Sequence, residues 1–173
     1  MEARRLFKSH IDDINLKNEP FDIFGRIIPV YDGNRWSFKL EQFENTTSIC
    51  FEDTYYNYDE LRGKHVFIGV YEEDKCVGVA VLKHSKNKYM CIQDIKVLEN
   101  CRRKGAGKEL LNLAKEIAKD NNYLGLYITT QDSNLIACRF CLKNGFKIGG
   151  IDTKTNNSTS QNGKIDVIFY LDI

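Results

Sequence analysis

The sequence of 173 residues lacks several features that would place it in a specialised class of protein. Its longest apolar run covers only residues 76–82, whereas a membrane-spanning helix needs about 20 such residues. No apolar segment follows the cations at the N-terminus, so we expect no signal peptide. The formal charge is only +1, and binding of nucleic acid through its phosphates needs a basic excess. We therefore expect neither a membrane nor a nucleic acid as its partner.

Cysteine and histidine are present, but without the spacing of a disulfide framework or a metal site. Of six cysteines, Cys76 and Cys91 stand in apolar, strand-like runs, where a free thiol packs as a small hydrophobe. A chain of this length folds without disulfides, which predicts reduced thiols in a cytoplasmic protein. Cys138 and Cys141 form a C-x-x-C pair inside a predicted helix rather than at its start, and the three histidines lack ligand spacing. We expect two packed thiols there and no metal.

The length of the chain predicts a single domain over residues 1–173, and the composition, 42% hydrophobic and 28% charged, is ordinary for a globular protein. Alternating apolar and β-branched segments with polar turns predict an antiparallel meander, and helical periodicity follows it. The sum is an α/β mixed sheet, a meander running into β-α-β-α-β. Strands are expected at residues 24–31, 35–43, 65–71, 76–83, 89–98, 124–130, 146–151 and 165–171.

Two helices are expected in the second half of the chain. The first presents one apolar face, and the second covers residues 134–144, with Gly145 as its C-terminal cap. Residues 44–64 are acidic and aromatic without a clean period, so we expect a loop with a short helix. Residues 152–163 read as a long surface loop. The apolar face of the first helix consists of Leu110, Leu111, Ala114, Ile117 and Ala118.

The segment between the third meander strand and the first helix carries the clearest chemical signal. Cations surround the predicted helix N-terminus, where free N–H groups and the helix dipole already present positive potential. A bound anion would offset the positive charge that gathers there. Gly105 and Gly107 would let the backbone approach a phosphate closely. A solvated basic loop is the alternative. Glu109 after Lys108 excludes a P-loop, and Leu110 excludes a dinucleotide fingerprint. The cations are Arg102, Arg103, Lys104 and Lys108.

The spacing of Arg102, Gly105 and Gly107 resembles the acyl-CoA pyrophosphate loop of the GNAT superfamily of N-acetyltransferases. A strand precedes this loop and a long helix follows it, as in that superfamily. The resemblance covers roughly residues 66–151 and implies the GNAT acyl-CoA N-acyltransferase fold, with acetyl-CoA as co-substrate and no metal. Further matches, to the last helix of the family and the strand after it, are Asn134, Ala137, Phe140, Gly145 and Phe146.

A narrower resemblance extends into the N-terminal segment. Several short segments look like streptothricin acetyltransferases, which acetylate an amine on the β-lysine part of that antibiotic. This implies antibiotic resistance as the function and a cationic small-molecule amine as the partner of a monomer or homodimer. Two alternatives remain open, an acetyltransferase for a protein or metabolite amine and an acetyl-CoA-binding module with little catalysis. The matching segments are residues 18–21, 24–26, 35–36, 130–132, 134–138 and 145–149.

The GNAT resemblance also implies which residues contact the co-substrate. The backbone of Ile95, Lys96 and Val97 would pair with pantetheine as an added strand. The pyrophosphate would lie on the loop amides, with Arg102 nearby. Asn134 would bind the pantetheine arm or act only as a helix N-cap, for which asparagine is a preferred residue. The loop amides are those of Arg103, Lys104, Gly105, Ala106, Gly107 and Lys108.

An ammonium group has no lone pair, so acetyl transfer to an amine requires a route for deprotonation. Asp94, on the strand that precedes the loop, is the candidate base, and a structural carboxylate is the alternative reading. The family's last helix usually carries a tyrosine as general acid where Cys141 stands, which makes Cys141 a candidate acid with a shorter side chain. Gln93 and Thr129 stand where streptothricin acetyltransferases tend to have carboxylates.

Acidic and aromatic residues could bind a cationic acceptor, because carboxylates attract ammonium groups and aromatic faces bind cations. The alternative for each of them is a place in a solvated loop. The candidate acceptor-binding residues are Asp22, Trp36, Glu52, Asp53 and Tyr55.

Overall fold

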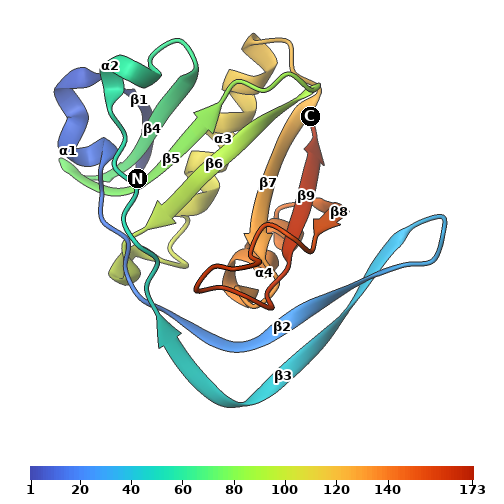
Figure 1. The fold of residues 1–173 in the computed structure, drawn as a ribbon. Coiled ribbons are helices and arrows are strands. Elements are labelled where there is room, and N and C mark those ends of the chain that lie inside the picture. The colour runs from blue at the N-terminus through green and yellow to red at the C-terminus, as the bar shows by residue number, and fades with distance from the viewer. The chain divides into compact units, whose positions relative to one another are not determined.

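The computed structural model describes residues 1–173 (Figure 1). The chain divides into two compact units. Unit 1 contains residues 1–20, 50–126 and 173, and unit 2 contains residues 21–49 and 127–172. None of the helices is long and apolar enough to cross a membrane.

Unit 1 is built on an antiparallel meander in which the strands lie in the order β1, β4, β5 and β6. These strands are β1 (Glu2–Leu6), β4 (His65–Glu72), β5 (Lys75–Lys83) and β6 (Tyr89–Val97). Every residue of β5 between its two terminal lysines is buried, as in a strand that is covered on both faces.

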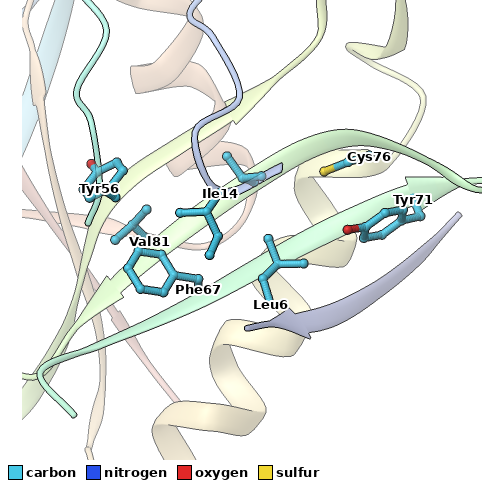
Figure 2. Packing of buried hydrophobic residues seen from close by; sticks show 8 residues of the cluster. Leu6, Ile14, Tyr56, Phe67, Tyr71, Cys76 and Val81 are labelled. Carbon is cyan, nitrogen blue, oxygen red and sulfur yellow. The ribbon is translucent and has the colours of Figure 1, made fainter. Parts of the chain in front are cut away.

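Helix α3 (Ala106–Asp120) packs against all four strands of the meander. Its entire predicted apolar face is buried, which confirms the helical periodicity read from the sequence. A second hydrophobic cluster joins the sheet to the short helix α1 (Ile11–Ile14) and contains Leu6, Ile14, Tyr56, Phe67, Tyr71, Cys76, Val79 and Val81 (Figure 2). The remaining short helices of the unit are η1 (Lys8–His10), α2 (Tyr58–Leu61) and η2 (Glu99–Cys101).

Unit 2 combines a long two-stranded ribbon with a smaller group of strands. The ribbon pairs β2 (Phe21–Tyr31) with β3 (Trp36–Ile49), and α4 (Leu135–Lys143) packs against β2. The other strands lie in the order β7, β9 and β8, with β8 antiparallel to β9. Their bounds are Gly125–Gln131 for β7, whose first two residues belong to unit 1, Lys147–Asp152 for β8 and Asp166–Asp172 for β9.

The turn between β2 and β3 has the conformation and contacts of a tight hairpin turn. Gly33 has a φ of 93°, and the Asp32 carboxylate accepts hydrogen bonds from the N–H groups of Asn34 and Arg35, both at 2.9 Å. These backbone bonds, the one from Arg35 first, lower the pKa of Asp32. The Asp-Gly-Asn sequence thus forms the turn of the hairpin, as expected.

The structure departs from the sequence prediction at two strands with little apolar character. Strand β1 was not expected, because its only buried residue is Leu6. Strand β3 continues to Ile49, six residues beyond the expected end, through a polar stretch that is exposed almost throughout. Both strands are held by backbone pairing with a neighbouring strand. The alternation of apolar and polar residues in a sequence does not reveal such pairing.

Candidate functional site

The loop before α3 offers a row of free backbone donors. Arg103 and Gly105 have positive φ values, 63° and 101°, and no side chain caps the helix, which begins at Ala106. The N–H groups of residues 103–107 have no acceptor within the protein, and the next two N–H groups both donate to the Gly105 carbonyl. Such a row of unpaired donors fits a multi-oxygen anion such as the pyrophosphate of a coenzyme.

Charge around the loop adds to this preference. Arg103, Lys104 and Lys108 are exposed, whereas Gly107 lies within the first turn of α3 and is half-buried. No group of three or more His, Cys, Asp or Glu side chains is placed to hold a metal ion. The exposed cations of the loop therefore favour a negatively charged ligand.

Arg102 differs from the other loop cations because its guanidinium is already engaged. Its Nε donates to the carbonyl of Val97 at 3.1 Å, and its Nη1 donates to the carbonyl of Pro20 at 2.9 Å. Its Nη2 lies 3.8 Å from the carboxylate of Glu19. These contacts turn the side chain to groups of the protein itself, so they fit a place near the pyrophosphate, as the resemblance implied, and disfavour Arg102 as its direct ligand.

A bulge in β6 lies immediately before Asp94. The residue pairs Leu82–Ile92 and Val81–Asp94 leave Gln93 as the extra residue of the strand. Such a bulge twists a strand and redirects the side chains beside it. The side-chain oxygen of Gln93 lies 3.0 Å from the Nε2 atom of His65.

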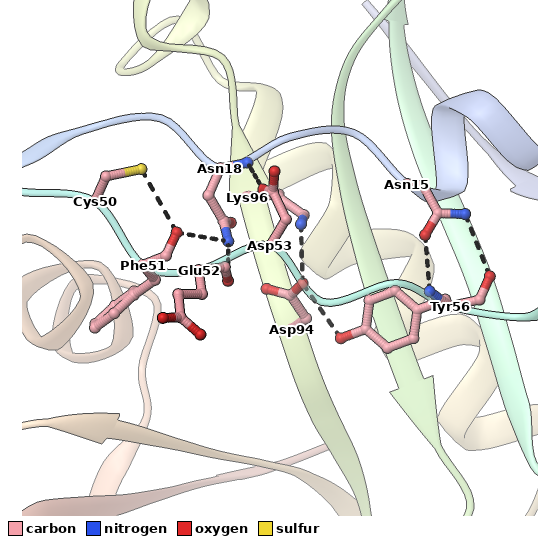
Figure 3. A network of polar contacts seen from close by, with 9 residues as sticks. All are labelled: Asn15, Asn18, Cys50, Phe51, Glu52, Asp53, Tyr56, Asp94 and Lys96. Carbon is pink, nitrogen blue, oxygen red and sulfur yellow. Dashed lines mark hydrogen bonds and ion pairs between the residues drawn. The ribbon is translucent and has the colours of Figure 1, made fainter. Parts of the chain in front are cut away.

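Asp94 is held by two side chains at one of its oxygens (Figure 3). Asp94 Oδ2 lies 3.3 Å from Lys96 Nζ and accepts a hydrogen bond from the Tyr56 hydroxyl, also at 3.3 Å. The Lys96 side chain is only 11% exposed, so water screens this ion pair less than it screens a surface pair. The other oxygen, Oδ1, has no protein partner. The structure thus joins the predicted residues Asp94 and Lys96 in one network.

Tyr56 is a member of this network that the sequence analysis missed. Burial raises the pKa of its hydroxyl, and the charge of Asp94 raises it further, so Tyr56 stays protonated and donates. Its backbone is fixed by Asn15, which accepts from Tyr56 N at 2.7 Å and donates to Tyr56 O at 3.2 Å. Tyr56 stands in an aperiodic acidic stretch, and no local pattern distinguishes it from its exposed neighbour Tyr55.

Asn134, at the start of α4 in unit 2, is a helix cap. Its Oδ1 accepts a hydrogen bond from the N–H of Ala137 at 3.1 Å. The cap role, one of two alternatives raised by the sequence, is therefore present. The Nδ2 group of Asn134 has no protein partner and remains able to donate to a ligand.

Cys141 lies in the interior of unit 2. Its side chain is completely buried, and burial, followed by the neighbouring Cys138, raises the pKa of its thiol. Burial also raises the pKa of Cys138 to about 12, and both thiols are free. The two thiols are packed, as expected, but a thiol with no exposed surface does not face a ligand. The structure therefore disfavours Cys141 as the general acid.

We expect Cys141→Ala to act on stability rather than on turnover. Removing a buried sulfur leaves a small cavity, which should lower the free energy of unfolding by about 1–2 kcal/mol. Chemical denaturation measures this, and kcat per folded molecule should stay within about twofold of the parent. Cys50→Ala, at an exposed position, is the matched control. A large loss of kcat with unchanged stability would restore Cys141 as a reacting group.

The predicted acceptor-binding residues are divided between the two units. In unit 2, Asp22 pairs with Ser48 in the ribbon, and the Trp36 ring lies 5.0 Å from the Tyr31 ring, centroid to centroid. In unit 1, Asp53 accepts a hydrogen bond from the N–H of Asn18 at 2.7 Å, which gives it a structural role. The other two residues of unit 1, Glu52 and Tyr55, are exposed. Tyr55 lines a small pocket with Lys8, Ile11, Asn57, Tyr58 and Asp59.

Comparison of sequences places this site among known proteins. Residues 34–146 match the model of the Acetyltransferase (GNAT) family. Streptothricin acetyltransferase A from Bacillus subtilis (strain 168) is 36% identical over 163 residues, which cover 93% of this chain and 94% of the relative. A streptothricin acetyltransferase from Escherichia coli is 26% identical over 149 residues, which cover 86% of this chain and 74% of the relative.

Solved structures agree with the sequence matches. A structure described as a streptothricin acetyltransferase from Bacillus anthracis str. Ames, in complex with acetyl coenzyme A, has a TM-score of 0.87 at 25% identity. The match covers 99% of this chain and 97% of that chain. Nourseothricin acetyltransferase has a TM-score of 0.83 at 18% identity, with the same coverage, and shows the fold alone.

Proposed function

Since the chain belongs to the GNAT acetyltransferase family and is an acetyl-CoA-dependent N-acetyltransferase, we propose that its acceptor is the β-lysine amine of streptothricin. The observation that carries this proposal is the 36% identity to a streptothricin acetyltransferase along nearly the whole of both chains. That match extends beyond the family's coenzyme loop into the N-terminal segments. An acetyltransferase for another amine would share the loop and need not share those segments.

For the co-substrate, we assign the pyrophosphate to the free N–H groups of residues 103–107, with Lys108 and the exposed loop cations beside it. The pantetheine arm would run along the backbone of Ile95, Lys96 and Val97. In unit 2, the Nδ2 group of Asn134 keeps free the capacity to donate that the resemblance implies. The loop is the best supported of these assignments, because its donors have no other partner.

In the proposed reaction, Asp94 accepts a proton from the ammonium group of the acceptor. The freed amine nitrogen attacks the thioester carbonyl, and a C–N bond forms. The C–S bond then breaks to release coenzyme A as a thiolate, and the nitrogen loses its second proton to water, which leaves a neutral amide. Lys96 and Tyr56 hold Asp94 Oδ2 and leave Oδ1 directed to the amine. They are positioning residues, since they act on the amine only through Asp94.

The leaving group does not require a side-chain acid in this scheme. A thiol of ordinary pKa, about 8.5, leaves as a thiolate near neutral pH and takes its proton from water. The scheme therefore works with Cys141 buried. Release of the thiol without a side-chain acid thus takes the place of the tyrosine acid that is usual in the family where Cys141 stands.

The cysteines support a reducing compartment for this activity. All six are free, and one of them, Cys50, is exposed. An exposed thiol persists most readily where cellular reductants keep it reduced. We place the protein in the cytoplasm on this ground.

We expect Tyr56→Phe to lower kcat/KM for the amine by about three- to tenfold, the value of one hydrogen bond to a charged group at a partly buried site. The carboxylate loses one of the two partners that hold Oδ2, so the loss should appear in kcat/KM for the amine and not in the affinity for acetyl-CoA. Initial rates at varied amine concentration and calorimetric titration with acetyl-CoA test both effects. Tyr58→Phe is the matched control, because the Tyr58 ring packs on Phe67 and its hydroxyl has no protein partner. Equal kcat/KM for the amine in both variants would remove Tyr56 from the site.

Release of the coenzyme A thiol, followed by a thiol-reactive dye, tests the acceptor. Streptothricin and free lysine are compared at equal concentration, with acetyl-CoA alone as the blank. Release that depends on streptothricin supports the proposal, as does protection of a sensitive host by the expressed chain. Release with other amines only would identify a different acetyltransferase. Binding of acetyl-CoA without release to any amine would favour a binding module.

A further inference from the structure

The contacts of Arg102 form a connection between the coenzyme loop and a distant part of the chain. Its guanidinium donates to Val97, at the end of β6, and to Pro20, in the N-terminal segment of unit 1. A guanidinium has several donors in one rigid plane, so it can hold these groups in one arrangement. Lysine could not, because its donors lie on a single nitrogen.

Glu19 completes the connection from the other side. Its Oε2 lies near Arg102 and also accepts a hydrogen bond from the N–H of Glu99, the first residue of η2. Arg102 follows η2 directly, and its own N–H donates to the carbonyl of Glu99 at 3.1 Å. One carboxylate oxygen therefore contacts both ends of the turn that leads into the loop.

The N-terminal end of this connection is itself anchored. Asn18 N donates to Asp53 at 2.7 Å, and Asn18 Nδ2 donates to the carbonyl of Glu52 at 2.9 Å (Figure 3). Residues 18–20 are thus fixed to the segment 51–53 just before Glu19 reaches the loop. A carboxylate on an anchored segment can restrain the backbone that it contacts.

We propose that Glu19 and Arg102 act as a latch that holds the coenzyme loop in its binding conformation. The loop needs such a restraint, because Arg103 adopts a φ of 63° that residues other than glycine rarely adopt. The N–H groups presented to the anion begin at this residue, immediately after the latch. The inference rests on the proposed pyrophosphate site, and it makes Arg102 a positioning residue rather than a ligand.

The latch and a direct pyrophosphate contact predict opposite signs for Glu19→Gln. If Arg102 binds pyrophosphate, removal of Glu19 frees the guanidinium and removes a nearby negative charge, so acetyl-CoA should bind more tightly. If the pair is a latch, the loop loses its restraint and acetyl-CoA should bind more weakly. We expect the dissociation constant to rise about three- to tenfold.

Calorimetric titration with acetyl-CoA tests this for the full chain and its variants. Arg102→Lys keeps the charge but not the planar donors, and should weaken binding as much as Arg102→Ala does. Glu99→Gln is the matched control, because it removes a charge next to the latch whose carboxylate has no protein partner. S-acetylpantetheine, which lacks the pyrophosphate, should bind the parent and Glu19→Gln equally. The KM for acetyl-CoA should rise in Glu19→Gln while the KM for the amine stays unchanged.

The outcomes separate the latch from the site on which it rests. Weaker acetyl-CoA binding in Glu19→Gln, at an unchanged thermal midpoint and with Glu99→Gln like the parent, supports the latch. Tighter or unchanged binding in Glu19→Gln overturns it, and so does parent-like binding in Arg102→Lys. If the parent does not bind acetyl-CoA, or binds no more tightly than Gly107→Asp, the pyrophosphate site itself is wrong.

Discussion

Gly107→Asp is expected to weaken acetyl-CoA binding by about 100-fold, or roughly 3 kcal/mol, without loss of the fold. Gly107 lies in the first turn of α3, and its N–H is the last of the free N–H groups of residues 103–107. A carboxylate there would occupy the space of the pyrophosphate and repel its charge. The same carboxylate is favourable for the helix, because a negative charge at a helix N-terminus contributes about 0.3–1 kcal/mol. Affinity and stability should therefore move in opposite directions.

Two matched variants separate size from charge in this experiment. Gly107→Asn has nearly the shape of aspartate without its charge, and Gly107→Ala adds only a methyl group. The affinity for acetyl-CoA, measured by calorimetry, should fall in the order parent, Gly107→Ala, Gly107→Asn and Gly107→Asp. Thermal unfolding should show no loss of stability in Gly107→Asp. Equal affinity in all four proteins would mean that the pyrophosphate lies elsewhere.

The parts of the molecule that sequence reasoning predicted are those determined by local pattern. The apolar face of α3 repeats with the helical period, and the turn at Gly33 carries its own signal. The loop proposed to bind the coenzyme is also a local pattern, because its glycines and cations are contiguous in sequence, but its role stays a prediction. Each of these features is encoded within about fifteen residues, where periodicity and turn chemistry operate.

The parts that were missed depend on contacts between residues far apart in the sequence. Tyr56 meets Asp94 across 38 positions, and Arg102 meets Pro20 across 82. No composition or spacing rule reports such pairs. Cys141 illustrates a related error, because the resemblance indicated the role usual at its position while burial in unit 2 determined its properties. A motif assigned Arg102 to the coenzyme in the same way, although its guanidinium is bound to the protein.

Asp94→Asn is expected to lower kcat at pH 7 by a factor of about 100–1,000, the usual contribution of a general base. Asparagine keeps the shape of the side chain and can still accept from Tyr56, but it cannot take a proton from the acceptor. Acetyl-CoA affinity should stay within about twofold of the parent. Steady-state rates and calorimetry measure the two effects. Asp74→Asn, in the exposed turn between β4 and β5, is the control for loss of one negative charge.

The pH dependence of Asp94→Asn identifies the base more sharply than the rate at one pH. Without a base, the reaction needs acceptor that is already deprotonated, and an alkyl amine has a pKa near about 10.4. Its rate should then rise about tenfold per pH unit, whereas the rate of the parent should depend on pH much less steeply, because its base removes the proton. The two enzymes should therefore converge at high pH. Burial raises the pKa of Tyr56, so that hydroxyl adds no ionisation between pH 6 and 9. Parallel profiles would instead assign the proton to a water chain, with Asp94 only orienting the amine.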